Sequence, residues 1–573
     1  MRKVRRTAAL VPLILLLGAC GRDTPAPAPP PSAAPPPMVS SASGPAPAAD
    51  PATRAAAVVR TLSDADLAGQ VLMPYAYGGD AFRVDQASAA ANRKLAGVDT
   101  PAEMVTKFRL GGLILVGFTA EDPTGATNPA TNVANPGQVR RLTAGLQQAA
   151  GRLPGGAPLL IGTDQEYGVV TRVKTGVTLL PSAMAFGAAA RPELTERAWQ
   201  AAGVELAAMG ITLTFAPVAD TLGPGGSAVI GSRSFGADPK LTAAQVAAAV
   251  RGLQRAGVAA TLKHFPGHGH TAADSHTELP VVSLSRAQWE AQDRPPFLAG
   301  VQAGAGLVMS GHLDVAALDK GVPATFSKRA MTDVLRTELR FSGVAVTDAM
   351  NMAPAMAWPP GEAAVRALNA GNDLLLMPPD ITAARDGVLA ALKDGSLPRE
   401  RLVEAVTRVL TLRFRSAGRP QPALATLASP EHQRAVRAAA AASITVLRGP
   451  CTGPAVRGPV TVTASGGREV ARVTLVKALQ AAGVPVQSAG GKVVHLVGYG
   501  DRRTDLSTGA EVTVGMDQPD LLASARSPVL ISTYSSSPAS MAALADVVAG
   551  RERAPGRSPV RVPGLPRSAC ARD

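Results

Sequence analysis

Aromatic residues are scarce in this chain and make up 3% of its 573 positions. Proteins that bind nucleic acid stack aromatic side chains on bases, and the chain contains no recognisable RNA- or DNA-binding motif. Its net charge of +14 therefore does not indicate a nucleic-acid partner. An anionic membrane or cell-wall surface fits this charge better.

Charged residues are also few, at 17%, while hydrophobic residues reach 46%. This balance excludes a globally disordered chain and allows a sizeable buried core. A length of 573 residues is too great for one domain. We therefore expect two or three domains.

Cysteine occurs 3 times, and the first cysteine follows a targeting pattern. Basic residues between Arg2 and Arg6 precede an apolar run, Ala8–Leu17, that is too short to span a bilayer as a helix. Small residues then stand directly before Cys20. The pattern resembles a bacterial lipoprotein signal, which implies cleavage before Cys20 and a lipid on its thiol. An ordinary secretory signal with a chance cysteine is the alternative.

On this interpretation residues 1–19 are a signal peptide and residues 20–54, rich in proline and alanine, are an extended tether. The body of the protein is then held outside the cytoplasm on the bacterial cell membrane. Cys451 and Cys570 lie in an oxidising compartment, where a disulfide between them is one outcome and two free thiols are the other.

Short apolar runs alternate with amphipathic segments over residues 55–415. The runs that predict strands are Gly112–Val116, Pro158–Gly162, Thr212–Phe215, Val258–Leu262, Leu307–Met309, Gly343–Val346 and Leu374–Leu376. The predicted helices include 138–150, 193–209, 243–256 and 328–340. Strands that alternate with helices pair in parallel, so this α/β pattern predicts a (β/α)8 TIM-type barrel. A doubly wound open sheet is the competing topology.

A second, smaller α/β domain of αβα sandwich type is predicted for residues 436–573, after a linker at 416–435. Its predicted strands are Val460–Thr463, Val493–Val497 and Val529–Ser532. No glycine-rich phosphate loop is visible in this region. The second domain therefore points to no cofactor.

Polar residues follow directly, or almost so, on several predicted strands. They are Asp164, Asp220, Lys263-His264, Ser310-Gly-His312 and Asp348. The carboxyl ends of barrel strands open onto one face, where active sites are built. A single residue of this kind is explained by a helix cap, but five in succession predict one pocket.

The third of these positions opens a loop that holds four of the 7 histidines: His264, His268, His270 and His276. Histidine exchanges protons near neutral pH. A solvated histidine-rich loop or an adventitious metal site would explain the composition alone. The neighbouring polar strand ends favour a pocket that needs no metal, with His268 and His270 serving the structure of the loop.

The stretch Lys263-His-Phe-Pro-Gly-His-Gly269 with Asp274-Ser-His276 resembles glycoside hydrolase family 3, and within it the β-N-acetylglucosaminidase branch of peptidoglycan turnover. Further matches are Asp164-Gln-Glu166, Gly231-Ser-Arg-Ser-Phe-Gly236, Met309-Ser-Gly-His312, Phe341-Ser-Gly-Val-Ala-Val-Thr-Asp348 and Ala370-Gly-Asn-Asp373. The resemblance covers residues 55–415 and is looser beyond them. It implies a retaining exo-β-N-acetylglucosaminidase acting on cell-wall fragments, without a cofactor or an obligate protein partner.

The resemblance also implies catalytic roles. A retaining glycosidase needs a carboxylate nucleophile and a second group that protonates the leaving oxygen. The family's nucleophile maps onto Asp348, and its histidine acid/base maps onto His276, oriented by Asp274. Residues i and i+2 of an extended loop point the same way, so the carboxylate can bond one ring nitrogen and leave the other for substrate.

Sugar binding is expected from residues on neighbouring strand ends. The set is Asp164, Arg172, Arg233, Lys263 and His264, with His312 in the site by motif but without an assigned role. A salt-bridge network that holds strand ends together is the alternative explanation for the basic residues. Two departures from the family stand out: Tyr167-Gly-Val169 replaces two glycines and an arginine, and Ala349 replaces a frequent second acid. Tyr167 is expected to narrow the pocket wall.

Three alternative functions remain. Family 3 glycosidases of other specificity, such as glucosidases, usually take their acid from the second domain and lack the Asp274-Ser-His276 loop. Phosphorolysis is compatible with a histidine acid/base, which repels phosphate less than a carboxylate does. A non-catalytic wall-binding lipoprotein would not need the intact set of acidic and basic residues.

Overall fold

The computed structural model describes residues 50–117, 132–224, 227–271 and 273–570. The predicted signal peptide, Cys20 and the tether up to residue 49 lie outside the described residues. Helix α1 (Pro51–Val59) begins inside the segment predicted as tether, because Asp50 caps it by accepting a hydrogen bond from the Thr53 amide. In the described part of the chain, none of the helices is long and apolar enough to cross a bilayer.

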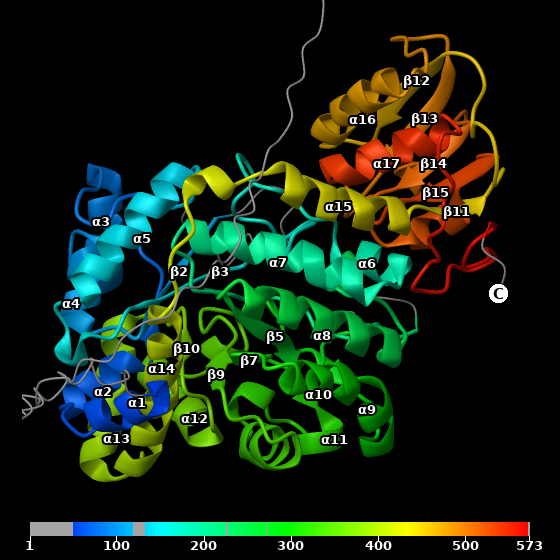
Figure 1. The fold of residues 1–573 in the computed structure, drawn as a ribbon. Helices are drawn as coiled ribbons and strands as arrows, with labels where there is room; N and C mark the ends of the chain where they lie inside the picture. Colours follow the sequence, from blue (N-terminus) through cyan, green and yellow to red (C-terminus); the bar gives the residue numbers. More distant parts are fainter. Residues whose placement is uncertain (1–49, 118–131, 225–226, 272, 571–573) are drawn as a thin grey trace, which may run out of the picture. The chain divides into compact units, whose positions relative to one another are not determined.

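Parallel strands close into a barrel in the N-terminal part of the chain (Figure 1). Six strands pair in the order β2-β3-β4-β5-β7-β9, and β1 (Leu72–Met73) pairs with β10 (Leu375–Leu376). The six are β2 (Gly112–Leu115), β3 (Leu160–Thr163), β4 (Leu213–Thr214), β5 (Ala259–Phe265), β7 (Leu307–Ser310) and β9 (Val344–Thr347). The Ile114 amide of β2 donates to the Pro74 carbonyl after β1, and the Thr347 amide of β9 donates to the Leu374 carbonyl before β10. These bonds join the β1–β10 pair to the two edge strands of the six-stranded sheet. The barrel prediction is confirmed, and an open sheet is excluded.

The barrel interior is filled by alternate residues of the strands. Ile114 and Leu160 belong to an apolar cluster that includes Met309, Val346 and Leu376, whereas their neighbours Leu113 and Ile161 pack in the larger cluster with the surrounding helices. Both faces of the sheet are buried, which explains why the strands read as continuous apolar runs. With the interior filled, polar residues at the carboxyl ends are left on one face.

Helices surround the barrel and mostly begin at a proline or a capping side chain, as in α8, where Asp238 accepts from the Lys240 and Leu241 amides. They are α2 (Asp64–Gln70), α3 (Gln86–Ala96), α4 (Pro101–Phe108), α5 (Pro136–Ala150), α6 (Ala183–Ala189), α7 (Pro192–Ala208), α8 (Pro239–Arg255), α9 (Arg286–Gln292), α10 (Arg294–Gln302), α11 (Ala316–Asp319), α12 (Pro360–Ala370), α13 (Ile381–Asp394) and α14 (Arg399–Ala417). Residues Arg329–Glu338, where the sequence predicts an α-helix, form a π-helix. Two short strands, β6 (Val281–Val282) and β8 (Asp314–Val315), pair apart from the barrel.

The C-terminal domain is a five-stranded sheet in the order β11-β15-β14-β13-β12, with β11 antiparallel to β15 and the other pairs parallel. Its elements are β11 (Thr445–Arg448), β12 (Val460–Ala464), β13 (Lys492–Val497), β14 (Val512–Gly515), β15 (Val529–Ser532), α16 (Glu469–Ala481) and α17 (Pro538–Val548). Helix α15 (Pro430–Ser443) packs on both α7 and α17. The predicted domain boundary at residue 436 therefore falls within a helix that contacts both domains.

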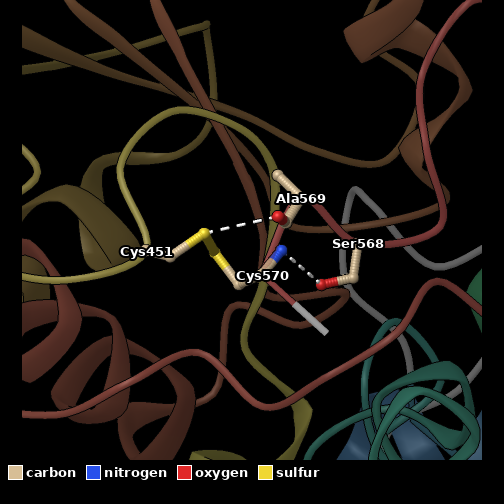
Figure 2. The surroundings of a disulfide bond; sticks show 4 residues. All are labelled: Cys451, Ser568, Ala569 and Cys570. Carbon is tan, nitrogen blue, oxygen red and sulfur yellow. Dashed lines mark hydrogen bonds between the residues drawn. A yellow bond between two sulfur atoms is a disulfide. The ribbon is translucent and has the colours of Figure 1, made fainter. Parts of the chain in front are cut away.

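A disulfide joins Cys451 to Cys570, 119 residues further along the chain (Figure 2). The sequence predicts either a disulfide or two free thiols for these cysteines, and the structure contains the disulfide. Just before the bridge, the Ala569 amide donates to the Val446 carbonyl of β11 at 2.7 Å. Earlier in the same segment, the Arg557 amide donates to the Ala188 carbonyl of α6 at 3.1 Å. The C-terminal segment is thus held at one end by the barrel and at the other by its own domain.

Candidate active site

A cavity lies at the carboxyl ends of the barrel strands. Its lining residues are Asp164, Val229, Arg233, Lys263, His264, His268, Ser275, His276, Met309, Asp348, Ala349, Met352, Leu376 and Met377. Asp164 follows β3, Lys263 and His264 belong to β5, and Asp348 follows β9. Residues far apart in the sequence therefore meet at one face, as the strand-end pattern predicts.

Asp348 is held by the backbone around it. Its amide donates to the Ser310 carbonyl of β7 at 2.9 Å, and its Oδ1 accepts from the Ala349 amide at 2.8 Å. Burial alone would raise the pKa of Asp348, but the nearby His264, His312 and His276 outweigh burial and lower this pKa below its ordinary value. The carboxylate is therefore ionised at neutral pH, as a nucleophile requires.

His276 and Asp274 form the pair that the sequence predicts for the loop. The ring Nδ1 of His276 donates to Asp274 Oδ1 at 2.6 Å, and the His276 amide donates to the same oxygen at 2.9 Å. Burial would raise the pKa of Asp274, but these two hydrogen bonds lower it. With Nδ1 occupied, Nε2 is the ring nitrogen left for other partners, and the His276 side chain lines the cavity. Asp274 is not part of the cavity lining.

His268 also lines the cavity, whereas the sequence predicts only a structural role for it within the loop. Its Nε2 lies 3.2 Å from the hydroxyl of Ser275, between the two members of the His276–Asp274 pair. Burial lowers the pKa of His268 to about 4, so the ring is neutral near pH 7. The neighbouring His270 pairs instead with Asp293, at 2.9 Å, outside the cavity lining.

Glu166 is the centre of a buried ion network. The sequence motif Asp164-Gln-Glu166 includes this residue but predicts no role for it. Its Oε2 accepts from Arg233 Nε at 2.8 Å, and its Oε1 lies 2.6 Å from Lys263 Nζ. All three side chains are only 3% exposed. Burial would raise the pKa of Glu166, but the two cations lower it well below its usual range. The same network raises the pKa of Lys263 against the effect of burial.

Asp164 connects this network to the cavity. It accepts from Lys263 Nζ at 2.8 Å, and Arg172 Nη2 lies 3.6 Å from its other oxygen. Arg172 is fully buried and absent from the cavity lining. Arg172 therefore lies behind Asp164 and does not line the cavity. It belongs to a salt-bridge network, which is the alternative role predicted for the basic residues. Arg233 and Lys263 belong to both the network and the cavity wall.

His264 is oriented by Asp220, a buried residue that the strand-end pattern predicts in the pocket without a specific role. The His264 ring Nδ1 donates to Asp220 Oδ2 at 2.8 Å, and the backbone amides of His264 and His268 both donate to Oδ1. The His264 Nε2 faces Arg233 Nη2 at 3.4 Å, which suits an acceptor nitrogen. Burial would raise the pKa of Asp220, but the two histidines lower it.

His312 lies behind the cavity, not in its lining. Its Nε2 donates to the Ala349 carbonyl at 3.0 Å, its Nδ1 lies 2.9 Å from the Thr325 hydroxyl, and its ring stacks on Phe326. Burial lowers the pKa of His312, so the ring is neutral near pH 7. His312 therefore holds the backbone next to Asp348.

Tyr167 does not narrow the pocket, contrary to the expectation from the sequence. Its backbone has a left-handed φ of 68°, and the residue is not part of the cavity lining. The ring is buried and packs edge-on against Trp199 of α7, with centroids 5.7 Å apart. In the described part of the chain, no group of three His, Cys, Asp or Glu side chains is arranged to hold a metal ion.

Comparison with known proteins places this site in a family. Residues 82–412 match the model of the glycosyl hydrolase family 3 N-terminal domain. Beta-hexosaminidase A from Pseudoalteromonas piscicida is 33% identical over 376 residues, which cover 61% of this chain and 61% of that protein. A beta-hexosaminidase from Stenotrophomonas maltophilia (strain K279a) is 42% identical over 254 residues, covering 43% of this chain and 73% of that protein.

A solved structure extends the likeness to both domains. The family 3 beta-N-acetylglucosaminidase from Paenibacillus sp. str. FPU-7 is 31% identical and superposes with a TM-score of 0.74. The superposition covers 87% of this chain and 99% of that one. The match therefore extends beyond the residues that the family model covers.

The ion network predicts a large difference between two glutamates that each pair with two cations. Glu166→Gln leaves Arg233 and Lys263 buried with too little negative charge, so we expect a loss of about 3–5 kcal/mol in the free energy of unfolding. Glu196→Gln is the matched control, since Glu196 pairs with Arg251 and Arg255. Those arginines are 43% and 61% exposed, so the loss should stay below about 1 kcal/mol. Urea unfolding measures both, and equal losses would contradict the network's role.

Proposed function

The chain belongs to glycosyl hydrolase family 3, and from that premise we propose that it is a retaining exo-β-N-acetylglucosaminidase, a β-N-acetylhexosaminidase. Its substrates on this proposal are terminal β-linked N-acetylglucosamine units of peptidoglycan fragments. The relatives that match this chain include proteins named beta-hexosaminidase and beta-N-acetylglucosaminidase. The matched part spans 61% of the first relative's length, so the activity of the whole protein is part of the proposal.

The observation that carries the proposal is the pairing of His276 with Asp274 in a cavity that also holds Asp348. A retaining glycosidase needs one group that attacks the anomeric carbon and another that exchanges a proton with the leaving oxygen. Asp348 is ionised at neutral pH and suits the first role. His276, with one ring nitrogen bonded to Asp274 and its side chain in the cavity wall, suits the second.

The reaction then takes two steps. Asp348 attacks the anomeric carbon, the bond to the leaving oxygen breaks, and the protonated His276 ring transfers its Nε2 proton to that oxygen. This leaves a glycosyl ester on Asp348 and a neutral imidazole. In the second step the imidazole takes a proton from water, the water oxygen attacks the anomeric carbon, and the ester bond to Asp348 breaks. Asp274 stabilises the imidazolium at the beginning and end of the cycle.

Sugar recognition on this proposal falls to the network around Glu166. Asp164 accepts hydrogen bonds from sugar hydroxyls, since its carboxylate is part of the cavity lining. Arg233 and Lys263 donate to hydroxyls and to the acetamido oxygen, and His264, whose Nε2 faces Arg233, orients that guanidinium in the cavity wall. Because these groups are already paired and buried, they present fixed charges to the substrate and need little reorganisation on binding.

Replacement of the nucleophile tests the proposal most simply. We expect Asp348→Ala to reduce kcat for an aryl β-N-acetylglucosaminide by about 10⁴-fold or more, because Asp164, the other carboxylate of the cavity lining, is paired with Lys263. The wild type should hydrolyse this substrate far faster than the aryl β-glucoside. Release of the aryl group measures both rates.

A helix-capping aspartate gives the matched control for Asp348. Asp380 follows β10 and accepts from the Ala383 amide at the start of α13. Asp380→Ala should cost about 1 kcal/mol of stability and leave turnover unchanged. Full activity in Asp348→Ala would refute the nucleophile assignment. Sugar 1-phosphate formed only with added phosphate would identify a phosphorylase, and an inactive wild type would favour a wall-binding protein.

The Asp274–His276 bond makes a prediction about pH dependence. The two hydrogen bonds from His276 lower the pKa of Asp274, so its carboxylate stays ionised and holds the ring over the working pH range. Asp274→Asn removes this carboxylate, and kcat/KM should fall by about 10²-fold across the pH profile. Asp293→Asn is the control, because it alters the Asp293–His270 pair, which lies outside the cavity lining. This variant should leave the pH profile unchanged. Superimposable profiles for Asp274→Asn and the wild type would remove His276 from the acid/base role.

Membrane attachment through Cys20 is the second part of the proposal. The basic segment, the apolar run and the small residues before Cys20 support a lipid-anchored protein outside the cytoplasm. Cys20→Ser keeps the size of the side chain but removes the thiol that would carry the lipid. Expressed in a bacterial host, the wild type should fractionate with membranes and take up labelled palmitate, and Cys20→Ser should not. Labelling of both proteins alike would exclude Cys20 as the anchor.

A further inference from the structure

Arg233 differs from the other charged residues of the cavity in its origin. Lys263 belongs to a barrel strand, and Asp164 and Asp348 follow directly on strands, whereas Arg233 belongs to the short turn η3 (Gly231–Arg233) between β4 and α8. Within the turn, the Gly231 amide donates to the Ser227 carbonyl at 2.8 Å, the Arg233 amide to the Ile230 carbonyl at 2.8 Å, and Arg233 Nη1 to the Val229 carbonyl at 3.2 Å. A loop residue in a buried ion network needs further support to hold its position.

The first support comes from the C-terminal domain. The hydroxyl of Ser232, directly before Arg233, donates to the Asp517 carboxylate, which follows β14. Ser232 is buried in this contact, at only 3% exposed, and Asp517 is half-buried. A Cβ atom on Gly231 would lie 3.7 Å from Gln518 Oε1 and 4.0 Å from Asp517 Oδ2. The turn therefore packs directly against the loop that follows β14.

The second support lies on the other side of Arg233 and comes from the C-terminal segment. The Ala237 amide donates to the Pro559 carbonyl at 3.1 Å. Gly236 has φ +143°, and a Cβ atom there would lie 2.7 Å from Pro559 Cβ, so only glycine allows this approach. The segment that carries Pro559 ends at the Cys451–Cys570 disulfide.

The carboxyl end of β14 is a position where open α/β sheets usually bind ligands. Here that position is occupied by the Ser232 hydroxyl of the barrel. Among the residues that the structure describes, none from the C-terminal domain lines the cavity, so this domain acts on the cavity through the barrel residues that it touches. The barrel residues that it contacts, Ser232 and Ala237, flank Arg233. Arg233 pairs with Glu166 and also lines the cavity.

We propose that the C-terminal domain positions Arg233 for substrate binding, with Asp517 and Pro559 holding the turn from both sides. Asp517 is a positioning residue: it acts through Ser232 on Arg233 and does not line the cavity. The inference rests on the proposed function, because it assigns Arg233 to sugar binding. It also gives the second domain a role in an enzyme whose catalytic groups all come from the barrel.

The test compares two hydrogen bonds between the barrel and the C-terminal domain. Ser232→Ala and Asp517→Asn alter the bond next to Arg233. Ser182→Ala removes a more deeply buried bond between the same two domains, from the Ser182 hydroxyl to the Tyr534 carbonyl at 2.6 Å, on a segment without cavity residues. For an aryl β-N-acetylglucosaminide we expect the first two variants to raise KM by about five-fold or more, with kcat within about two-fold. Ser182→Ala should change neither constant.

Coupling to Arg233 separates positioning from general stability. Ser232→Ala should add no further increase in KM to Arg233→Lys, because the residue that it positions is already altered. Hydrogen exchange gives a readout that needs no turnover: amides of residues 229–238 should exchange faster in Ser232→Ala and Asp517→Asn than in the wild type or Ser182→Ala.

Unchanged exchange of residues 229–238 in both variants would overturn the inference, whatever the activity. Equal effects of Ser182→Ala on KM and on this exchange would overturn it as well, since they would indicate a general effect of domain contact. An inactive wild type would refute the proposed function alone, and the exchange comparison would still decide whether the C-terminal domain holds the turn.

Discussion

The site depends on a constraint of charge: Glu166, Arg233 and Lys263 are almost entirely buried and must be paired with one another. Each is costly to bury alone, and the removal of any one leaves uncompensated charge in a place that water does not reach. The barrel meets this constraint because β3 and β5 flank the two-residue strand β4, and Lys263 at the end of β5 reaches both Asp164 and Glu166 after β3. Arg233 completes it from a loop, and contacts with the C-terminal domain hold that loop.

Aspartate–histidine pairs provide a second set of buried polar contacts around the cavity. Asp220 orients His264, and Asp274 orients His276, so each ring has one nitrogen committed and one free for a further partner. Asp348 lies among these rings, and their effect on its carboxylate exceeds that of burial. The same histidines that attract notice in the sequence therefore divide into separate tasks. His276 faces the proposed substrate, His264 faces Arg233, and His268 contacts Ser275 in the loop between them.

Features set by local pattern could be predicted from the sequence, and features set by distant partners could not. The apolar run before Asp348 predicts β9, and the polar residue after it predicts a place at the barrel mouth. Strand β1 is only two residues long, and β14 alternates valine with threonine and glycine, so neither stands out. Glu166 lies 67 residues from Arg233, and no local signal reveals that they pair. Tyr167 packs against Trp199, 32 residues further along the chain, from a left-handed backbone that its residue type does not suggest.

Capture of the covalent intermediate tests the central claim, that Asp348 is the group that bonds to the sugar. The protein would be treated with a fluorinated N-acetylglucosaminyl fluoride, which forms the glycosyl ester quickly and hydrolyses slowly, and then digested and analysed by tandem mass spectrometry. The account predicts one added sugar per protein, on the peptide that contains Asp348, and none on Asp348→Ala. A sugar on any other carboxylate, such as Asp164 or Glu166, or rapid turnover with no labelled species, would contradict it.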